Sequence, residues 1–155
     1  MHRNFARPSR RMLADCAPMP TQPTPRVRRA PVPDDAVLVV RGDELDPAVI
    51  QQDAARFHRR FRNWGRYGVS AFLARDDAEV DALCETRLRQ WATAAVFTRS
   101  ALQGVGIEVV PTFRTPHVTL AHTELAELVD RLVTCEHRIV INPYHEPDVG
   151  PLEAR

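Results

Sequence analysis

The sequence contains no lysine, and all 21 of its basic residues are arginine. Asparagine is almost absent as well and occurs only at Asn4, Asn63 and Asn142. Lysine and asparagine have codons rich in A and T, whereas arginine, alanine and proline have codons rich in G and C. The composition therefore indicates a GC-rich genome. Because codon supply explains the abundance of arginine, the presence of an arginine is not by itself evidence for a phosphate site.

Cysteine and long apolar runs are also scarce. Cys16, Cys84 and Cys135 are an odd number of cysteines without a CxxC pair, which excludes a disulfide framework. Cys84 and Cys135 fall in expected helices, where a thiol behaves as a small hydrophobic group. A reducing compartment, the cytoplasm, is therefore expected. No apolar run approaches the roughly 20 residues that cross a bilayer, so no membrane partner is expected.

Charge and proline are distributed unevenly along the chain. The net charge of +1 excludes a global basic field that would attract nucleic acid. Residues 1–35 hold seven Arg, three Asp and seven of the 13 prolines, for a net charge of +4, whereas residues 36–155 carry −3. The first segment lacks hydrophobic periodicity, which predicts a disordered Arg/Pro-rich leader over 1–35. A folded domain over 36–147 and a flexible tail over 148–155 complete the expected organisation.

Short β-branched or apolar runs alternate with amphipathic segments in the remaining chain. Strands are expected at 36–40, 67–74, 92–98, 107–110, 117–121 and 138–141, and the main helices at about 46–64, 76–88 and 123–135. The first helix shows the clearest signals, with Asp46 as N-cap and Pro47 at its first position. Phe57 and Phe61 lie on its apolar stripe. This order predicts a single layered α/β domain with a mixed five- or six-stranded sheet and three main helices.

The segment Pro116-His117-Val118-Thr119-Leu120 resembles one half of the signature of the 2H phosphoesterases. That family uses two facing His-x-Thr/Ser segments, and the resemblance implies an acid/base role for His117 and phosphate binding by Thr119. No other histidine of the chain stands two residues before Ser or Thr, so the second half is missing. Strand alternation alone also explains the pattern, with Val118 and Leu120 in the core and His117 and Thr119 on the outer face.

A second resemblance, to the ADP-ribosyltransferase group, spans Val39-Val40-Arg41-Gly42 and Tyr67-Gly68-Val69-Ser70-Ala71-Phe72. It implies that Arg41 holds a pyrophosphate and that Ser70 supports a ribose, with Glu108 or His117 as the acidic or substitute residue. A guanidinium is suited to bidentate phosphate binding, and an adjacent glycine lets a ligand approach closely. The Ser-Thr-Ser run and the Glu-x-Glu motif of that group are absent. The alternative is that Arg41 is a surface residue at a strand end and Ser70 a small core residue.

The loop between Pro111 and His117 and the arginines of the first helix complete the candidates. Two prolines stiffen a loop that displays Arg114 and Thr115, and loops on a rigid scaffold often carry function. The segment 56–67, which joins several arginines to Trp64 and Tyr67, fits either a partner-binding surface or a solvated helix face.

The spacings of His117, His122, Cys135 and His137 match no established zinc pattern, and the chain has no phosphate loop, GxGxxG or GxSxG motif.

Two classes of function follow. The first is a small bacterial-type, toxin-like enzyme that acts on a nucleotide or other phosphate-bearing substrate by phosphoester or ADP-ribosyl chemistry. The second is a non-catalytic module that binds a protein partner through residues 56–67. For the enzyme, the expected catalytic residues are His117, Ser70 and Glu108, no cofactor or metal is expected, and the expected substrate-binding residues are Arg41, Arg114, Thr115, Thr119 and Tyr67.

Overall fold

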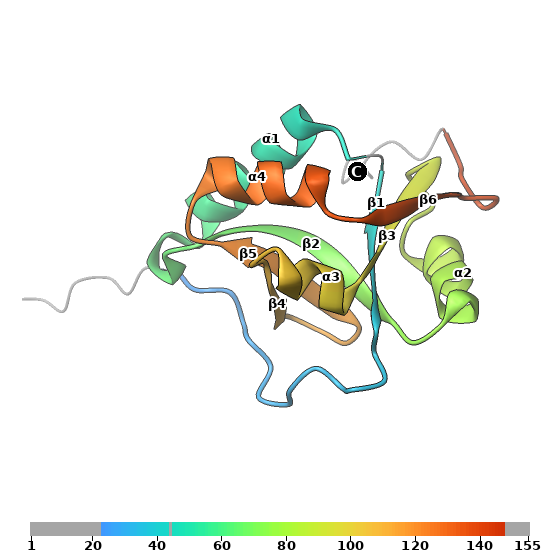
Figure 1. Ribbon diagram of the computed structural model, residues 1–155, viewed down its shortest axis with the longest axis horizontal. Coiled ribbons are helices and arrows are strands. Elements are labelled where there is room, and N and C mark those ends of the chain that lie inside the picture. The colour runs from blue at the N-terminus through green and yellow to red at the C-terminus, as the bar shows by residue number, and fades with distance from the viewer. Residues whose placement is uncertain (1–22, 44, 148–155) are drawn as a thin grey trace, which may run out of the picture.

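The computed structural model describes residues 23–43 and 45–147, which form one six-stranded sheet with helices on both faces (Figure 1). The strands are β1 (Leu38–Gly42), β2 (Tyr67–Ala74), β3 (Thr93–Thr98), β4 (Glu108–Pro111), β5 (His117–His122) and β6 (His137–Ile141). The helices are α1 (Pro47–Arg60), α2 (Asp77–Thr86), the short α3 (Arg99–Gly104) and α4 (Leu125–Thr134), with a 3-10 turn, η1 (Arg62–Trp64). The expected single α/β domain with six strands and three main helices is confirmed.

The sheet order is β4-β5-β2-β1-β3-β6, and all five strand pairings are antiparallel. A mixed sheet was expected, because strands alternate with helices along the chain. The difference arises from which strands become neighbours. Both β2 and β3 pair with β1 in the antiparallel sense, so they run in the same direction, as strands joined by a crossover helix usually do. However, β1 lies between them, and the parallel pairing is never made.

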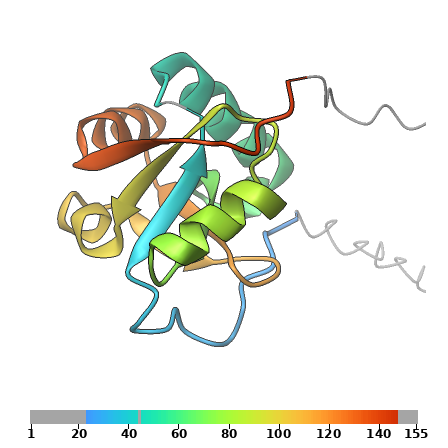
Figure 2. The same ribbon diagram turned by 90° about the vertical axis from the view of Figure 1, so that its right-hand side faces the viewer.

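Strand alternation divides the core into two clusters. Alternate residues such as Val39 and Phe97 face α1, α3 and α4, and their cluster includes Ile50 and Leu128. The neighbouring residues, such as Val40, face the apolar side of α2. Figure 2 shows α2 on the opposite side of the strands from α3 and α4. The cluster that contains α2 includes Val40 of β1, Ala74 of β2 and Val96 of β3, so this helix covers the centre of the second face of the sheet.

Helix ends follow local chemistry. The side chain of Asp46 accepts a hydrogen bond from Ala48 N at 2.8 Å, and Pro47 is the first residue of α1, as expected. Asp76 caps α2 by accepting from Glu79 N at 2.9 Å. The sequence predicts that Thr123 caps the last helix, but α4 begins one residue later, with Glu124 as its N-cap, and the imidazole of His122 accepts from Glu124 N.

Residues 23–36, here called the strap, lie along the domain, although residues 23–35 were expected to belong to the disordered leader. Val27 forms an antiparallel bridge with Thr112 after β4. Arg28 N donates to Pro111 O and Phe113 N donates to Arg26 O, both at 2.8 Å. Figure 1 shows this blue segment following the β4–β5 side of the domain before it enters β1. The remaining expected leader, 1–22, and the expected tail, 148–155, lie outside the described residues.

The strap contains prolines and no hydrophobic period, so local sequence does not predict its order. Its order comes from backbone groups of β4 and the following loop, which are far away in the sequence, and from Ala36, which is buried in the core at 5% exposure. The proline-rich composition fits such an extended path, because proline is compatible with extended backbone and needs no hydrogen-bond partner for an N–H.

Removal of the strap is expected to destabilise the domain. A chain beginning at residue 37 loses the bridge to the β4–β5 loop and the hydrogen bond from Arg99 Nη1 to Pro33 O, 2.7 Å long. With a net contribution of about 1 kcal/mol for each lost hydrogen bond, we expect a loss of about 2–4 kcal/mol in the free energy of unfolding, measured with urea. A chain beginning at residue 23 is the control. Equal stability of the two chains would contradict a structural role for the strap.

Candidate functional site

The sheet separates at one end of β1. Pairing between β1 and β2 ends at Val40↔Phe72, whereas pairing of β1 with β3 continues to Gly42↔Ala94. On its other side, β2 stays paired with β5 down to Tyr67↔His122. The two central strands therefore diverge at the end of β1 and the beginning of β2, and a cleft opens between them.

Arg41 fills the space where strand pairing stops. Its Nη1 donates to Ser70 O at 3.1 Å, and its Nη2 lies 2.7 Å from Oδ2 of Asp53 on α1. Ser70 lies beyond the last β1–β2 pair, so the guanidinium replaces strand pairing as the partner of this carbonyl. Arg41 is only 7% exposed, and a charge buried to that extent needs its paired carboxylate. The alternative of a surface residue at a strand end is therefore wrong for Arg41.

The cavity at this separation, here called the β1–β2 cleft, has a volume of about 440 Å³. Its floor includes Gly42, Gly68, Ser70 and Phe72. One side is formed by α1 and the following residue, and the other by the α2–β3 loop, with the end of the β4–β5 loop closing it. The residues that line these sides are Asp53, Arg56, Phe57, Arg60 and Phe61, then Arg87, Leu88, Gln90 and Trp91, and finally Phe113 and His117.

Positive charge exceeds negative charge around the cleft. Asp53 lies 2.7 Å from Arg41 and 3.7 Å from Arg56, so its single carboxylate is shared between two guanidinium groups. Arg60 lies over the ring of Phe61 at 5.0 Å. Neither Arg60 nor Arg87 forms an ion pair with a carboxylate of residues 23–43 or 45–147. The cleft thus offers two cations to an anionic ligand, beside aromatic walls.

His117 begins β5 and lines the cleft between two aromatic rings, Phe72 at 5.5 Å and Phe113 at 5.1 Å. Its Nδ1 lies 2.9 Å from Thr112 Oγ1, which in turn lies 2.7 Å from Thr119 Oγ1. Thr112 and Thr119 are fully buried. This hydroxyl chain holds the ring through Nδ1 and leaves Nε2 without a hydrogen bond to any described residue.

Burial lowers the pKa of His117 below its ordinary value. A hydrogen bond with the backbone of Thr112 opposes this shift, and the positive charges of Arg28 and Arg87 add to it. The imidazole is therefore neutral at neutral pH and can accept a proton. An anion bound in the cleft would offset the positive charge of Arg87, so it is expected to raise the pKa of His117.

Arg28 of the strap holds the two ends of the loop before His117 together. Its Nη1 donates to Thr112 O and to His117 O, each at 2.7 Å. Sequence analysis missed this residue because it lies in the segment expected to be disordered, and one arginine among seven there carries no distinguishing signal. The strap therefore positions part of the candidate site.

The structure brings together only some of the expected site residues. Arg41, Ser70 and His117 all line the cleft. Thr119 is buried behind His117 rather than on an outer face, so its hydroxyl supports Thr112 and is not placed to hold a phosphate. Ser70 is exposed at the cleft and is not a core residue.

The other expected residues lie elsewhere. Glu108 pairs with Arg66 at 2.5 Å on the edge strand β4. The ring of Tyr67 stacks on His58 at 4.3 Å. Arg114 contributes its backbone oxygen to His117 N, at 2.8 Å, and its side chain does not line the cleft. Thr115 faces a separate cavity.

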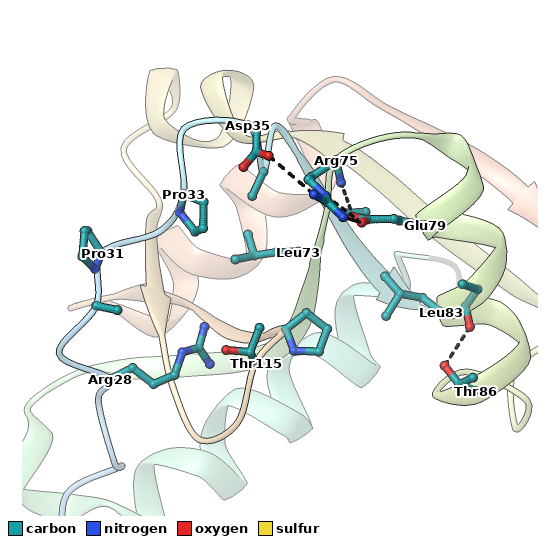
Figure 3. Close-up of a pocket in the computed structure, with 15 residues that line it drawn as sticks. Arg28, Pro31, Pro33, Asp35, Leu73, Arg75, Glu79, Leu83, Thr86 and Thr115 are labelled. Carbon is teal, nitrogen blue, oxygen red and sulfur yellow. Dashed lines mark hydrogen bonds and ion pairs between the residues drawn. The ribbon is translucent and has the colours of Figure 1, made fainter.

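That second cavity, of about 450 Å³, lies between the strap, α2 and the β4–β5 loop (Figure 3). Thr115 and Pro116 line it from the loop, and Arg75 pairs with Glu79 at its rim. The loop from Thr112 to Pro116 thus separates two cavities, with Phe113 and His117 facing the cleft and Thr115 facing the other one.

The histidines and cysteines weighed as metal ligands do not assemble into a site. Nδ1 of His137 lies 2.7 Å from Cys135 O, and Nδ1 of His122 accepts from Glu124 N. Within residues 23–43 and 45–147, no three His, Cys, Asp or Glu side chains gather closely enough to hold a metal ion. In the same part of the chain, no helix has the length and apolar character needed to cross a membrane.

Comparison of the chain with protein-family models, curated proteins and solved structures finds no match.

Gly68 is expected to tolerate no side chain. A Cβ there would lie 2.4 Å from Thr119 Cγ2 and 3.1 Å from Phe57 Cε1. Gly68→Ala should therefore displace Thr119, which belongs to the hydroxyl chain behind His117, and destabilise the protein by about 1–3 kcal/mol. Gly104→Ala in α3 is the control, because no atom lies within 4 Å of its Cβ position. Equal urea midpoints for the two variants would contradict this packing role.

The lowered pKa of His117 predicts a pH dependence of stability. The unfolded chain binds a proton at His117 near pH 6.5, before the folded chain does. Stability from the neutral ring is therefore complete above about pH 6.5, is lost as the pH falls below it, and levels off below the folded-state pKa. The free energies of unfolding of the wild type and of His117→Gln are measured with urea from pH 8 to pH 5. The wild type should lose stability relative to the variant as the pH falls. A pH-independent difference would show that His117 is not held neutral by the fold.

Proposed function

We propose that the protein is a small enzyme that binds a phosphate-bearing substrate in the β1–β2 cleft and uses His117 for proton transfer. The observation that carries this proposal is the placement of a partly buried imidazole with lowered pKa in the same cavity as Arg60 and Arg87. Perturbed titratable groups in clefts are candidates for function on physical grounds.

The charges favour phosphate over a neutral ligand. Guanidinium groups bind phosphate oxygens with paired hydrogen bonds, and such charge-assisted bonds are stronger than neutral ones. Arg41 already uses two of its five N–H donors on Ser70 and Asp53, so it maintains the cleft and is not the main phosphate ligand. The sequence predicted a substrate-binding role for Arg41, and we propose this role for Arg60 and Arg87 instead.

The chemistry is a displacement at phosphorus. Neutral His117 accepts the proton of an attacking hydroxyl or water at Nε2 while the new P–O bond forms. The P–O bond to the leaving group breaks, and the imidazolium returns the proton to the leaving oxygen. Arg60 and Arg87 stabilise the negative charge on the phosphoryl oxygens during this step.

The positions of the acidic residues favour phosphoester chemistry over ADP-ribosyl transfer. Glu108 pairs with Arg66 on β4 and does not line the cleft. The carboxylate that does line it, Asp53, is held by Arg41. An activating carboxylate for an acceptor is therefore lacking among the described residues of the cleft, whereas the groups for proton transfer to and from a phosphate ester are present.

The interaction-module alternative receives less support. Trp64 packs on Phe57 at 5.6 Å, and the guanidinium of Arg66 lies over its ring at 5.1 Å. The exposed large hydrophobic residues of the described chain lie outside the segment 56–67, at Val27, Val37, Ile139 and Ile141. The segment proposed as a docking surface therefore lacks an exposed apolar centre of the kind that partner surfaces need.

The test is a titration with ribose 5-phosphate, followed through the His117 imidazole resonances by NMR. Binding should raise the pKa of His117, because the phosphate offsets nearby positive charge. Arg60→Gln and Arg87→Gln should each weaken binding about tenfold or more, as expected for the loss of a charge-assisted hydrogen bond. Arg59→Gln is the matched control, because Arg59 is exposed on the same helix and does not line the cleft.

Catalysis is tested separately with bis(p-nitrophenyl) phosphate, whose hydrolysis releases a coloured product. His117→Ala should reduce the rate by about 100-fold or more, the usual scale of general acid–base catalysis. Phosphate binding without any His117-dependent hydrolysis would refute the enzymatic part of the proposal, and the absence of binding would refute both parts.

A further inference from the structure

Trp91 lies directly on the backbone of Gly42 at the side of the cleft. A Cβ built at Gly42 would lie 2.3 Å from Cε3, 2.5 Å from Cδ2 and 2.8 Å from Cζ3 of the indole. These three atoms are neighbours in the six-membered ring, so the ring covers the position that any side chain at residue 42 would occupy. Gly42 is required for this close contact.

The loop that carries Trp91 is held by a buried amide. Asn142, 4% exposed, donates from Nδ2 to Leu88 O at 2.9 Å and to Trp91 O at 3.1 Å. Its Oδ1 accepts from Tyr144 N at 2.9 Å, and its backbone N–H donates to Ala92 O at 2.8 Å. Trp91 is thus held on one side by its contact with Gly42 of β1 and on the other by the hydrogen bonds of Asn142, which follows β6.

A rigid indole is an unusual wall for a site that binds phosphate alone. A phosphate group gains little from an aromatic surface, whereas a nucleobase stacks on it. Trp91 lies in the same loop as Gln90 and close in sequence to Arg87, so aromatic, amide and cationic groups line one side of the cleft. The cleft volume of about 440 Å³ is within the range of small-molecule sites.

We propose that the substrate of the β1–β2 cleft is a nucleotide whose base stacks on Trp91 while its phosphate lies between Arg60 and Arg87. This inference rests on the proposed function, because it places the phosphate in the same cleft beside His117. It adds that the base, and not only the phosphate, determines which compounds bind.

The experiment uses the tryptophan itself as the probe. The chain has two tryptophans, Trp64 and Trp91, so Trp64→Phe leaves Trp91 as the single indole. Its fluorescence is titrated with adenosine 5′-monophosphate, ribose 5-phosphate and inorganic phosphate. We expect the nucleotide to quench Trp91 and to bind at least fivefold more tightly than ribose 5-phosphate.

Variants at position 91 separate stacking from phosphate binding, with affinities measured by calorimetry. Trp91→Ala should weaken nucleotide binding by roughly 5- to 150-fold and leave ribose 5-phosphate binding unchanged. Trp91→Phe should retain most of the nucleotide affinity, because it keeps an aromatic surface, and it serves as the folded control if the alanine variant unfolds.

Two results would overturn the inference in different ways. Equal affinity for nucleotide and sugar phosphate, insensitive to position 91, would refute base stacking and leave the proposed phosphate site intact. Failure of all three compounds to bind the Trp64→Phe chain and the wild type would refute the inference together with the proposed function.

Discussion

The ion pair between the buried Arg41 and the half-buried Asp53 occurs where the sheet opens, and the candidate site depends on it. The β1–β2 pairing stops two residues before β1 ends, which leaves backbone groups of β2 without a strand partner on that side. Arg41 bonds one of these carbonyls and pairs with α1 through Asp53. If the strands stayed paired to the end of β1, the floor of the cleft would be closed. If Arg41 lacked Asp53, a charge that is 7% exposed would lose its counter-ion, which is strongly destabilising.

The strap provides a second constraint on the same site. Its Arg28 bridges the carbonyls of Thr112 and His117, and Thr112 in turn bonds the imidazole. Phe113, between them, has a φ of 55°, a left-handed conformation that costs a residue with a side chain some stability. Its ring packs against His117 at 5.1 Å and Phe61 at 6.0 Å. The loop is thus held by contacts at both ends while its aromatic residue reaches the cleft.

Sequence patterns predicted the elements of the fold well where the cause is local. The N-cap at Asp46 and the place of Pro47 at the first position of α1 depend on near neighbours in the chain, and both are found. The pairing directions of the strands were not predictable, because they depend on β1 lying between β2 and β3. The order of the strap was missed for a similar reason, since its hydrogen bonds join residues more than 80 positions apart.

The site was also predictable in part, again where the cause is local in the sequence. Arg41 and His117 could be singled out at a strand end and after a loop, and Ser70 through the resemblance to the ADP-ribosyltransferase group; all three line the cleft. Arg60 was a candidate only as one of several arginines of the first helix. Arg87 and Trp91 could not be singled out, because nothing in their local sequence separates them from other surface residues. Gly42 marks the difference most clearly. Its sequence context suggested room for a ligand beside Arg41, whereas in the fold that room is taken by Trp91. A glycine can therefore indicate a close contact without revealing its partner. Here the glycine admits an aromatic wall, and the ligand must bind beside that wall and not on the glycine itself.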